Sequence, residues 1–257
     1  MQNPQSIVIT GASSGIGENL ALAYAAPGVR LAITGRDEAR LAGVAERCRG
    51  AGATVTAARV DAADRKAMAD WLRGIDAATP IDLMIANAGI ASGTPEGRED
   101  PDLARRTFDV NLTGVLNSLQ PLIEPMIARK RGQLVIMSSL ASFRGFAGSA
   151  AYCASKAAVR VWGEGMRNEL ARHGVEVNVV CPGFVVSRMT AVNKFHMPFL
   201  METGRAAAII KRGLARNKSR ISFPWPMSAA LWLLATLPAA WTDPFMRRMP
   251  KKGAAQG

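Results

Sequence analysis

Cysteine is scarce in this 257-residue chain. Its three cysteines, Cys48, Cys153 and Cys181, lack the spacing of metal ligands, and their odd number argues against a disulfide framework. A reducing compartment, the cytoplasm, is the simplest interpretation. The first strand is expected from Ser6 onward, so we expect no signal peptide. The sequence also lacks internal repeats and low-complexity linkers, which favours one large domain.

Tyrosine is scarcer still, and the chain is strongly basic. The net charge is +12, with 32 Lys and Arg residues against 20 Asp and Glu residues. Such a balance is typical of some nucleic-acid-binding proteins. Here the basic residues are scattered and only two tyrosines are present, so we find no platform for stacking bases. A basic surface without a nucleic-acid partner is therefore the favoured interpretation.

Short apolar runs alternate with helical runs along most of the chain. Hydrophobic residues make up 49% of the sequence, enough for a sizeable core. Strands that alternate with helices are typical of α/β proteins with a mainly parallel sheet. The expected strands cover 6–10, 30–34, 54–60, 81–86, 133–137, 175–180 and 220–223. The expected helices cover 18–25, 38–49, 64–77, 102–129, about 150–172 and 203–215.

The most informative pair of side chains is Tyr152 and Lys156, which lie in an alanine-rich helical run. Their spacing places both on one face of a helix. A free phenol titrates near ~10, and an ammonium group ~5 Å away would favour the phenolate by roughly 3 kcal/mol at an effective dielectric of ~20. We therefore expect a lowered pKa for Tyr152, suited to general acid–base catalysis. Alone, this spacing also occurs by chance on many helix faces.

A glycine-rich turn follows the first expected strand. Its glycines are spaced G-x-x-x-G-x-G, and a helix is expected directly after them. Any tight turn can use glycine, but glycines also let the backbone approach a pyrophosphate, and a helix N-terminus offers free N–H groups. In this position the turn predicts a dinucleotide site. Its expected ligands are Gly11, Ser13, Ser14, Gly15, Ile16 and Gly17.

The end of the second expected strand meets the adenosine ribose in nucleotide-binding units of this kind. Gly35 supplies no carboxylate there, whereas the guanidinium of Arg36 can pair with a 2′-phosphate. We therefore favour NADP over NAD. Asp37 is a rival ribose ligand, but its place before 38–49 is more typical of a helix N-cap. Asp61, after the third expected strand, is placed to bind the adenine amino group or to cap the next helix.

Other strand ends carry small or polar residues where open α/β sheets bind ligands. The segment Asn87–Gly89 closes the fourth expected strand, and Ser138 and Ser139 close the fifth. Asn111 lies inside the helix expected at 102–129, an unfavourable place for asparagine. We expect it either on the solvent face or in a specific role.

Two loops are expected around these strand ends. The first is polar and covers 93–101. The second, from Phe184 to Phe199, is apolar, and its Met, Phe and Pro content suits a lid over an apolar ligand. We extend this lid to about residue 215 and expect a hydrophobic, lipid-like carbonyl compound or alcohol as substrate.

Taken in order, these motifs resemble those of the short-chain dehydrogenase/reductase family. The resemblance covers about residues 6–223 and implies a single Rossmann-like doubly wound domain at 1–223. It also implies an NAD(P)-dependent oxidoreductase acting on CH-OH or C=O groups. The motifs are Thr10–Gly17, Asn87–Gly89, Asn111, Ser139, Tyr152–Lys156 and the pair Pro182 and Gly183.

The resemblance implies a role for each catalytic residue. Tyr152 would be the general acid or base, Ser139 would hydrogen-bond the substrate oxygen, and Lys156 would lower the pKa of the tyrosine and hold the nicotinamide ribose. Asn111 would fix a water that links Lys156 to solvent. A homo-oligomer, either a dimer or a tetramer, is expected, and no metal. The remaining cofactor residues would be Asn87, Ala88, Gly89, Pro182, Gly183, Val185 and Ser187.

The chain departs from the family pattern in several places. Ala86 stands where the family often has a second asparagine, and Ser187 stands where a threonine is common but keeps the hydroxyl. The usual glycine-rich ending is replaced by Pro224, Trp225 and Pro226. Two other functions stay open: an NAD-dependent alcohol dehydrogenase, and a nonenzymatic membrane adaptor on the same fold.

Residues 224–257 are expected to form an apolar and then basic helical extension. The run 227–237 is almost wholly apolar, but it is too short and too interrupted by proline for a membrane span. Its tryptophans and the basic end suit a peripheral anchor at the inner face of a membrane. A helix buried in a subunit interface or over the substrate pocket is an equal alternative. The basic end contains Arg247, Arg248, Lys251 and Lys252.

Overall fold

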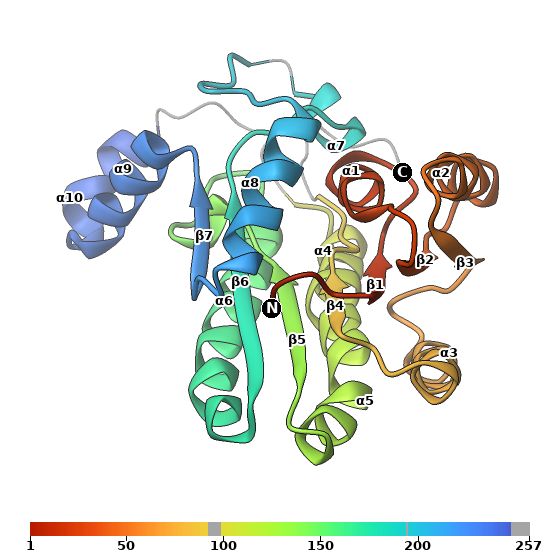
Figure 1. Ribbon diagram of the computed structural model, residues 1–257. Coiled ribbons are helices and arrows are strands. Elements are labelled where there is room, and N and C mark those ends of the chain that lie inside the picture. Colours follow the sequence, from red (N-terminus) through yellow and green to blue (C-terminus); the bar gives the residue numbers. More distant parts are fainter. Residues whose placement is uncertain (92–98, 194, 248–257) are drawn as a thin grey trace.

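A parallel sheet forms the centre of the computed structural model (Figure 1), which describes residues 1–91, 99–193 and 195–247. Every neighbouring pair of strands is parallel, in the order β3-β2-β1-β4-β5-β6-β7. The order reverses between β1 and β4, so the chain is doubly wound, as predicted. The strands are β1 (Ser6–Thr10), β2 (Arg30–Thr34), β3 (Thr54–Ala58), β4 (Leu83–Ala86), β5 (Gly132–Met137), β6 (Val175–Pro182) and β7 (Arg220–Phe223).

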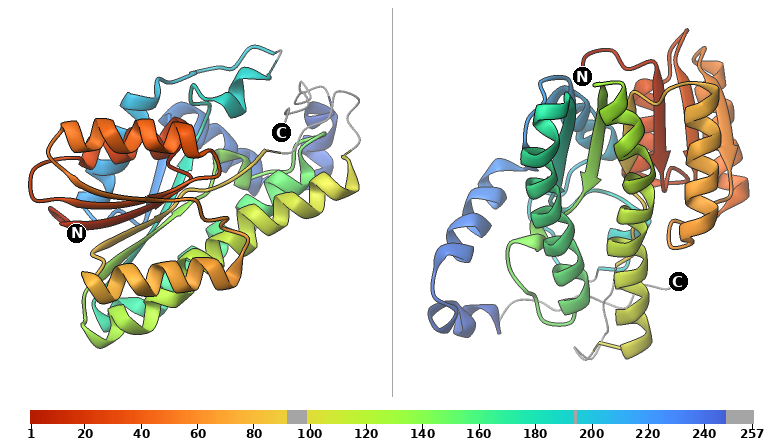
Figure 2. Two further views of the ribbon diagram at one scale, coloured as in Figure 1. Left: turned by 90° about the vertical axis from the view of Figure 1, so that its right-hand side faces the viewer. Right: turned by 90° about the horizontal axis from the view of Figure 1, so that it is seen from below.

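Helices cover both faces of the sheet (Figure 2). One face carries α1 (Gly15–Tyr24), α2 (Glu38–Gly50) and α8 (Thr203–Ala215). The other face carries α3 (Arg65–Ala78), α5 (Gly114–Ala128) and α6 (Ala150–Leu170), and α4 (Pro101–Phe108) packs against α6. This three-layer arrangement is the α/β architecture that the sequence predicts.

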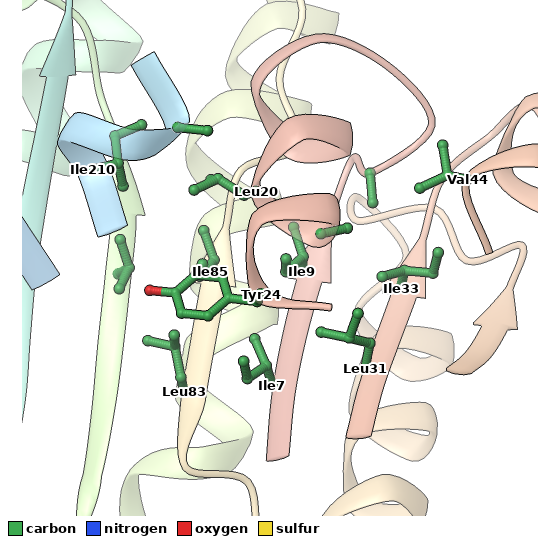
Figure 3. Packing of buried hydrophobic residues seen from close by; sticks show 14 of the residues in the cluster. Ile7, Ile9, Leu20, Tyr24, Leu31, Ile33, Val44, Leu83, Ile85 and Ile210 are labelled. Atoms are coloured by element: carbon green, nitrogen blue, oxygen red, sulfur yellow. The ribbon is translucent and has the colours of Figure 1, made fainter. Parts of the chain in front are cut away.

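The two hydrophobic cores alternate along the central strands. Ile7 and Ile9 of β1 share one core with Leu20 and Tyr24 of α1 (Figure 3). Val8, between them, belongs to the core on the opposite face. Since successive side chains of a strand point to opposite faces, a strand covered on both sides is apolar at nearly every position. The short uninterrupted apolar runs in the sequence follow from this burial.

Most expected boundaries are confirmed to within a few residues, but the helix expected at 102–129 is not continuous. It divides into α4, a π-helical turn at Asp109–Thr113 and α5. The π-turn contains Asn111, whose side-chain amide donates to the Ile90 carbonyl at 2.9 Å and accepts from the Ile90 N–H at 2.8 Å. Single π-turns of this kind are frequent at functional sites. Residues 93–98 of the expected polar loop lie outside the described residues.

Two other predicted segments, the third strand and the lid, have different bounds in the structure. The strand expected at 54–60 ends at Ala58, because the Val60 N–H donates to the Thr34 hydroxyl at 3.1 Å. In the range 184–215, expected as a lid, the part from 203 onward is α8, which packs on α1 and belongs to the core. Whether this range covers a substrate stays a prediction.

Two short helices, α9 (Trp225–Thr236) and α10 (Ala239–Met246), lie beyond β7 at the edge of the sheet (Figures 1 and 2). α9 packs on β7 and buries Leu231. α10 contacts Arg144, whose guanidinium donates to the Thr242 hydroxyl and lies 3.7 Å from the Asp243 carboxylate. In the part of the chain that the structure describes, no helix has the length and apolar character to cross a membrane. Three of the expected basic residues, Arg248, Lys251 and Lys252, lie outside that part.

The packing of α6 on the sheet depends on Gly163. A Cβ atom there would lie 2.5 Å from Ile136 Cδ1 and 2.8 Å from Val179 Cγ2. Gly163→Ala should therefore lower the free energy of unfolding by roughly 1–3 kcal/mol. The matched control is Gly165→Ala on the same helix, because nothing lies within 4 Å of its Cβ position in the described structure. This control should gain roughly 0.5–1 kcal/mol. Urea denaturation measures both variants, and equal midpoints would contradict the packing.

Candidate active site

The C-terminal ends of β1 and β4 meet where the strand order reverses. The two strands pair in parallel, and the Thr10 hydroxyl, at the end of β1, accepts from the N–H groups of Asn87 and Ala88 at 3.1 Å each. Open α/β sheets bind ligands in the crevice at such a point. The segment Asn87–Gly89 therefore lies beside the glycine turn.

The glycine turn after β1 packs tightly against the end of β4. Gly11 has a φ of +65°, and a Cβ atom there would lie 2.8 Å from Ala88 Cα. Because L side chains rarely adopt this φ and no side chain fits the space, the position requires glycine. The Asn87 amide donates to the carbonyls of Thr10 and Gly11 at 3.0 and 3.1 Å. Its side chain thus supports the turn from behind.

The N-terminus of α1 emerges from this turn at Gly15. The N-cap residue is Ser14, and its side chain makes no capping hydrogen bond in the described structure. The N–H groups of the first helical turn are therefore available to an anion. Ile16 is partly buried against the core. Ser13 lies at the end of β2, since a Cβ atom at Gly35 would come within 2.9 Å of Ser13 Cβ.

Arg36 follows Gly35 directly and is exposed. The neighbouring Asp37 is the N-cap of α2, as predicted: its carboxylate accepts from the Arg40 N–H at 2.9 Å and pairs with the Arg40 guanidinium at 2.8 Å. The carboxylate that competed with Arg36 as a ribose ligand is therefore engaged in capping.

Asp61 lies on the loop after β3. Its carboxylate accepts from the Ala63 N–H at 3.0 Å, whereas α3 is capped by Asp64, which accepts from the Ala67 N–H at 3.0 Å. The alternative that Asp61 caps this helix is therefore wrong. A contact of Asp61 with adenine stays a prediction.

Ser139, Tyr152 and Lys156 come together between the end of β5 and the start of α6. The Ser139 hydroxyl hydrogen-bonds with the Tyr152 phenol. Lys156 is only 3% exposed, its Nζ donates to the Met137 carbonyl at 2.9 Å, and it lies 5.9 Å from the centroid of the Tyr152 ring. The two side chains share one face of α6, as their spacing predicts.

Asn111 is completely buried beside this cluster, so the solvent-face alternative is wrong. Its amide nitrogen also donates to Ser155 Oγ at 3.2 Å, and that hydroxyl donates to the Tyr152 carbonyl at 2.8 Å. A Cβ atom at Gly89 would lie 3.1 Å from Asn111 Oδ1 and 3.3 Å from Lys156 Nζ. Asn111 and Lys156 therefore flank Gly89, at the point where the segment after β4 and α6 approach each other.

Burial sets the pKa values of the Tyr152–Lys156 pair. Loss of water raises the pKa of Tyr152 above its usual value, and the hydrogen bond with Ser139 offsets this only in part. Loss of water also lowers the pKa of Lys156 to about 8. The expected lowering of the Tyr152 pKa is therefore wrong in this structure, because desolvation by burial is the largest influence on the phenol.

The segment after β6 lies against the glycine turn. A Cβ atom at Gly15 would lie 3.5 Å from Ser187 Cβ. Ser187 begins the short helix α7 (Arg188–Ala191) in a capping box with Thr190, and Val185 forms a parallel β-bridge with Met201. Both predicted cofactor residues of this segment are thus held beside the crevice.

Pro182 and Gly183 join that segment to the sheet. The Pro182 carbonyl lies 3.5 Å from the Ser139 hydroxyl, and the Gly183 N–H donates to the Phe223 carbonyl at 2.7 Å. The predicted Pro-Gly turn is therefore fixed between the cluster and β7.

A carboxylate that the sequence does not single out holds the start of α6. Both oxygens of Glu99 accept from the Ala151 N–H, at 3.0 and 2.9 Å, one residue before Tyr152. A negative charge at a helix N-terminus is favourable. The partners are 52 residues apart, so no local motif could have indicated the contact.

In the described residues, no group of three or more His, Cys, Asp or Glu side chains is arranged to hold a metal ion. Cys48, Cys153 and Cys181 are buried, and no disulfide joins them. The side chains that do come together here, Ser139, Tyr152 and Lys156, are of types used in acid–base chemistry.

Comparison with known proteins decides the family. Residues 5–196 match the model of the short chain dehydrogenases. The chain belongs to the short-chain dehydrogenase/reductase family. It is therefore an oxidoreductase that acts on CH-OH or C=O groups with a nicotinamide cofactor.

Individual relatives of this dehydrogenase agree with the assignment. An uncharacterized oxidoreductase of Myxococcus xanthus is 40% identical over 95% of this chain and 97% of its own length. An uncharacterized oxidoreductase of Mycobacterium tuberculosis is 32% identical over 90% and 94%. Among solved structures, a short-chain dehydrogenase from Sphingobium yanoikuyae in complex with NADPH is 25% identical and covers 98% of both chains, with a TM-score of 0.80.

The low pKa of Lys156 predicts how the stability of this dehydrogenase depends on pH. Lysine ordinarily titrates at 10.5, and the buried Lys156 at about 8, so between these values the unfolded chain binds more protons than the folded one. The free energy of unfolding should therefore increase as the pH rises from about 8 to 10.5, because of Lys156. Lys156→Met should remove this contribution. Urea denaturation of both proteins across the range measures it, and parallel curves would show that burial does not perturb Lys156.

Proposed function

We propose that this dehydrogenase uses NADPH to reduce a carbonyl group on a hydrophobic substrate, or oxidises the corresponding alcohol in reverse. The observation that carries the proposal is the Ser139–Tyr152–Lys156 cluster, which adjoins Gly89 beside the glycine turn. The cluster combines a proton donor, a hydrogen-bond partner for a substrate oxygen and a cation. Carbonyl reduction requires these groups next to a hydride donor.

The glycine turn has features that suit a dinucleotide. The turn has no side chains at Gly11, Gly15 and Gly17, and the first turn of α1 is not capped by Ser14, which suits a pyrophosphate. When bound, the nicotinamide would supply or accept the hydride. The residues proposed to hold the cofactor are Gly11, Ser13, Ser14, Gly15, Ile16, Gly17, Arg36, Asp61, Asn87, Ala88, Gly89, Tyr152, Lys156, Pro182, Gly183, Val185 and Ser187.

The surroundings of Arg36 support NADPH over NADH. Its guanidinium is exposed at the end of β2, and Asp37 is engaged as a helix cap. A guanidinium in this position can bind a 2′-phosphate, which NADH lacks. The relative from Sphingobium yanoikuyae, solved with NADPH, adds support by similarity. An NAD-dependent alcohol dehydrogenase is the alternative.

Tyr152 would donate its proton to the substrate oxygen in reduction, so that C=O becomes CH-OH. Its raised pKa keeps the phenol protonated at neutral pH, as a proton donor must be. Ser139 would bind the same oxygen. The Lys156 ammonium would stabilise the phenolate left behind and, with a pKa of about 8, is mostly charged at neutral pH. In alcohol oxidation the phenolate would take the proton back.

An apolar segment between β6 and α8 supports a hydrophobic substrate. Phe184 and Phe195 pack edge to face with centroids 5.9 Å apart, and Val186, Phe199 and Leu200 are exposed. A loop of this composition can close over an apolar ligand and exclude water. We therefore propose that it is the lid.

We propose that the enzyme works in the cytoplasm as a homo-oligomer, either a dimer or a tetramer. A nonenzymatic adaptor is disfavoured because Tyr152 and Lys156 are both present and are brought to one site. Such an adaptor would not require either side chain.

Tyr152→Phe should remove turnover and leave cofactor binding nearly unchanged, because it deletes the proton donor and little else. The expected loss is ~10²–10⁴-fold, the usual contribution of a general acid. Ketone reduction measures turnover, and NADPH fluorescence measures binding. Tyr24→Phe is the matched control, since Tyr24 is the other tyrosine of the chain and is buried between α1 and α8. If Tyr152→Phe kept more than about a tenth of wild-type turnover, the acid–base assignment would be wrong.

Arg36→Ala should weaken NADPH binding about 10- to 100-fold and leave NADH binding almost unchanged, because only NADPH has the 2′-phosphate. Arg73→Ala on α3 removes an exposed arginine that pairs with Asp70 and serves as the control for lost positive charge. Titration of each variant with both cofactors gives the dissociation constants. Equal losses for NADPH and NADH would refute the NADP assignment and favour the NAD-dependent alternative.

A further inference from the structure

Helices α9 and α10 expose several large apolar side chains. Trp225 is 78% exposed and Trp241 is 74% exposed. A patch of this kind on a soluble protein marks a contact with a partner or a membrane. We call the six exposed side chains of these helices and the turn between them the tail surface: Trp225, Trp232, Leu233, Leu237, Trp241 and Phe245.

A strip of positive charge adjoins the tail surface. Two shallow depressions, of about 310 and 240 Å³, lie along β7, and Arg220 and Ser222 line both of them. Trp225 and Trp232 line the first depression, so the tail surface and the charged strip are continuous. We call the cations of the second depression the basic rim: Arg212, Arg216, Lys218 and Arg220.

The charge of the basic rim is largely uncompensated. Arg220 pairs with Glu164 at 2.9 Å. Arg212, Arg216 and Lys218 are exposed and form no ion pair with any residue that the structure describes. Arg247, at the end of α10, is exposed as well. Apolar residues with tryptophan beside unpaired cations match the two layers of a lipid surface, acyl chains and anionic headgroups.

A second copy of the chain fits this surface less well. A two-fold interface is formed by the same patch of both copies, so it would gather two basic rims into one contact area. Like charges brought together in this way disfavour association. Lys and Arg side chains near anionic lipid, by contrast, each strengthen binding.

We propose that the tail surface and the basic rim together bind the surface of an anionic lipid bilayer, with the chain lying on the membrane. The contact has a consequence for the site, which rests on the function proposed above. Arg144, on the loop between Ser139 and Tyr152, contacts Thr242 and Asp243 of α10. Binding through α10 would hold this loop near the bilayer, where an apolar carbonyl substrate dissolves.

Vesicle co-sedimentation of the full chain tests the proposal. We compare phosphatidylcholine vesicles with vesicles that also contain phosphatidylglycerol. Binding to the anionic vesicles should be at least tenfold tighter, since the rim carries several cations worth about 1 kcal/mol each. It should weaken as salt is added, because salt screens exposed charges.

Two pairs of substitutions separate the contributions. Trp232→Glu with Trp241→Glu should abolish binding, and Arg212→Glu with Arg216→Glu should weaken it at least tenfold. Arg65→Glu with Arg73→Glu is the matched control, because it reverses the same number of charges on α3, away from α9 and α10 (Figure 1). Circular dichroism and NADPH binding establish that each variant is folded. Neither pair touches the proposed catalytic residues.

Three results would overturn the proposal. The full chain could fail to sediment with anionic vesicles. The control could lose as much binding as the basic-rim variant, which would indicate nonspecific attraction of a basic protein. Light scattering could show that the tryptophan variant turns an oligomer into monomers while vesicle binding is absent in both, in which case the tail surface is a subunit contact.

Discussion

The close approach of Gly11 to Ala88 is the constraint on which the arrangement of this protein depends. It fixes the ends of β1 and β4 against each other, with 2.8 Å between a hypothetical Gly11 Cβ and Ala88 Cα. Gly89 follows Ala88 directly, and a Cβ atom there would lie 3.1 Å from Asn111 Oδ1 and 3.3 Å from Lys156 Nζ. A side chain at Gly11 would separate the strand ends and, with them, the nucleotide turn from α6.

Desolvation is the second constraint, because it acts on fold and chemistry together. α6 crosses the sheet closely enough to bury Lys156, and this burial costs the ammonium its water and lowers its pKa to about 8. The same burial raises the pKa of Tyr152. The pair is therefore better described as a protonated phenol with a cation ready to stabilise its anion than as a standing phenolate.

Features that depend on residues close together in the sequence could be predicted. The central strands β1, β4, β5 and β6 could be located from apolar runs, because strands buried on both faces are apolar at nearly every position. The spacing of Tyr152 and Lys156 likewise predicted their shared face. Contacts between distant segments could not be predicted in this way. Glu99 meets Ala151 across 52 residues, the π-turn at Asn111 depends on Ile90, and the basic rim exists only because α8 and β7 are neighbours. The raised pKa of Tyr152 was missed because its depth of burial is also a tertiary property.

Turnover of a panel of ketones and alcohols, with NADPH, NADH and their oxidised forms, tests most directly the claim that this crevice is a carbonyl–alcohol redox site. Loss of the reduced cofactor and formation of the alcohol are followed in the same reaction. The account predicts that apolar ketones consume NADPH and yield alcohol in equal amounts, faster than with NADH. Cofactor that binds without turnover of any ketone or alcohol in either direction would contradict it.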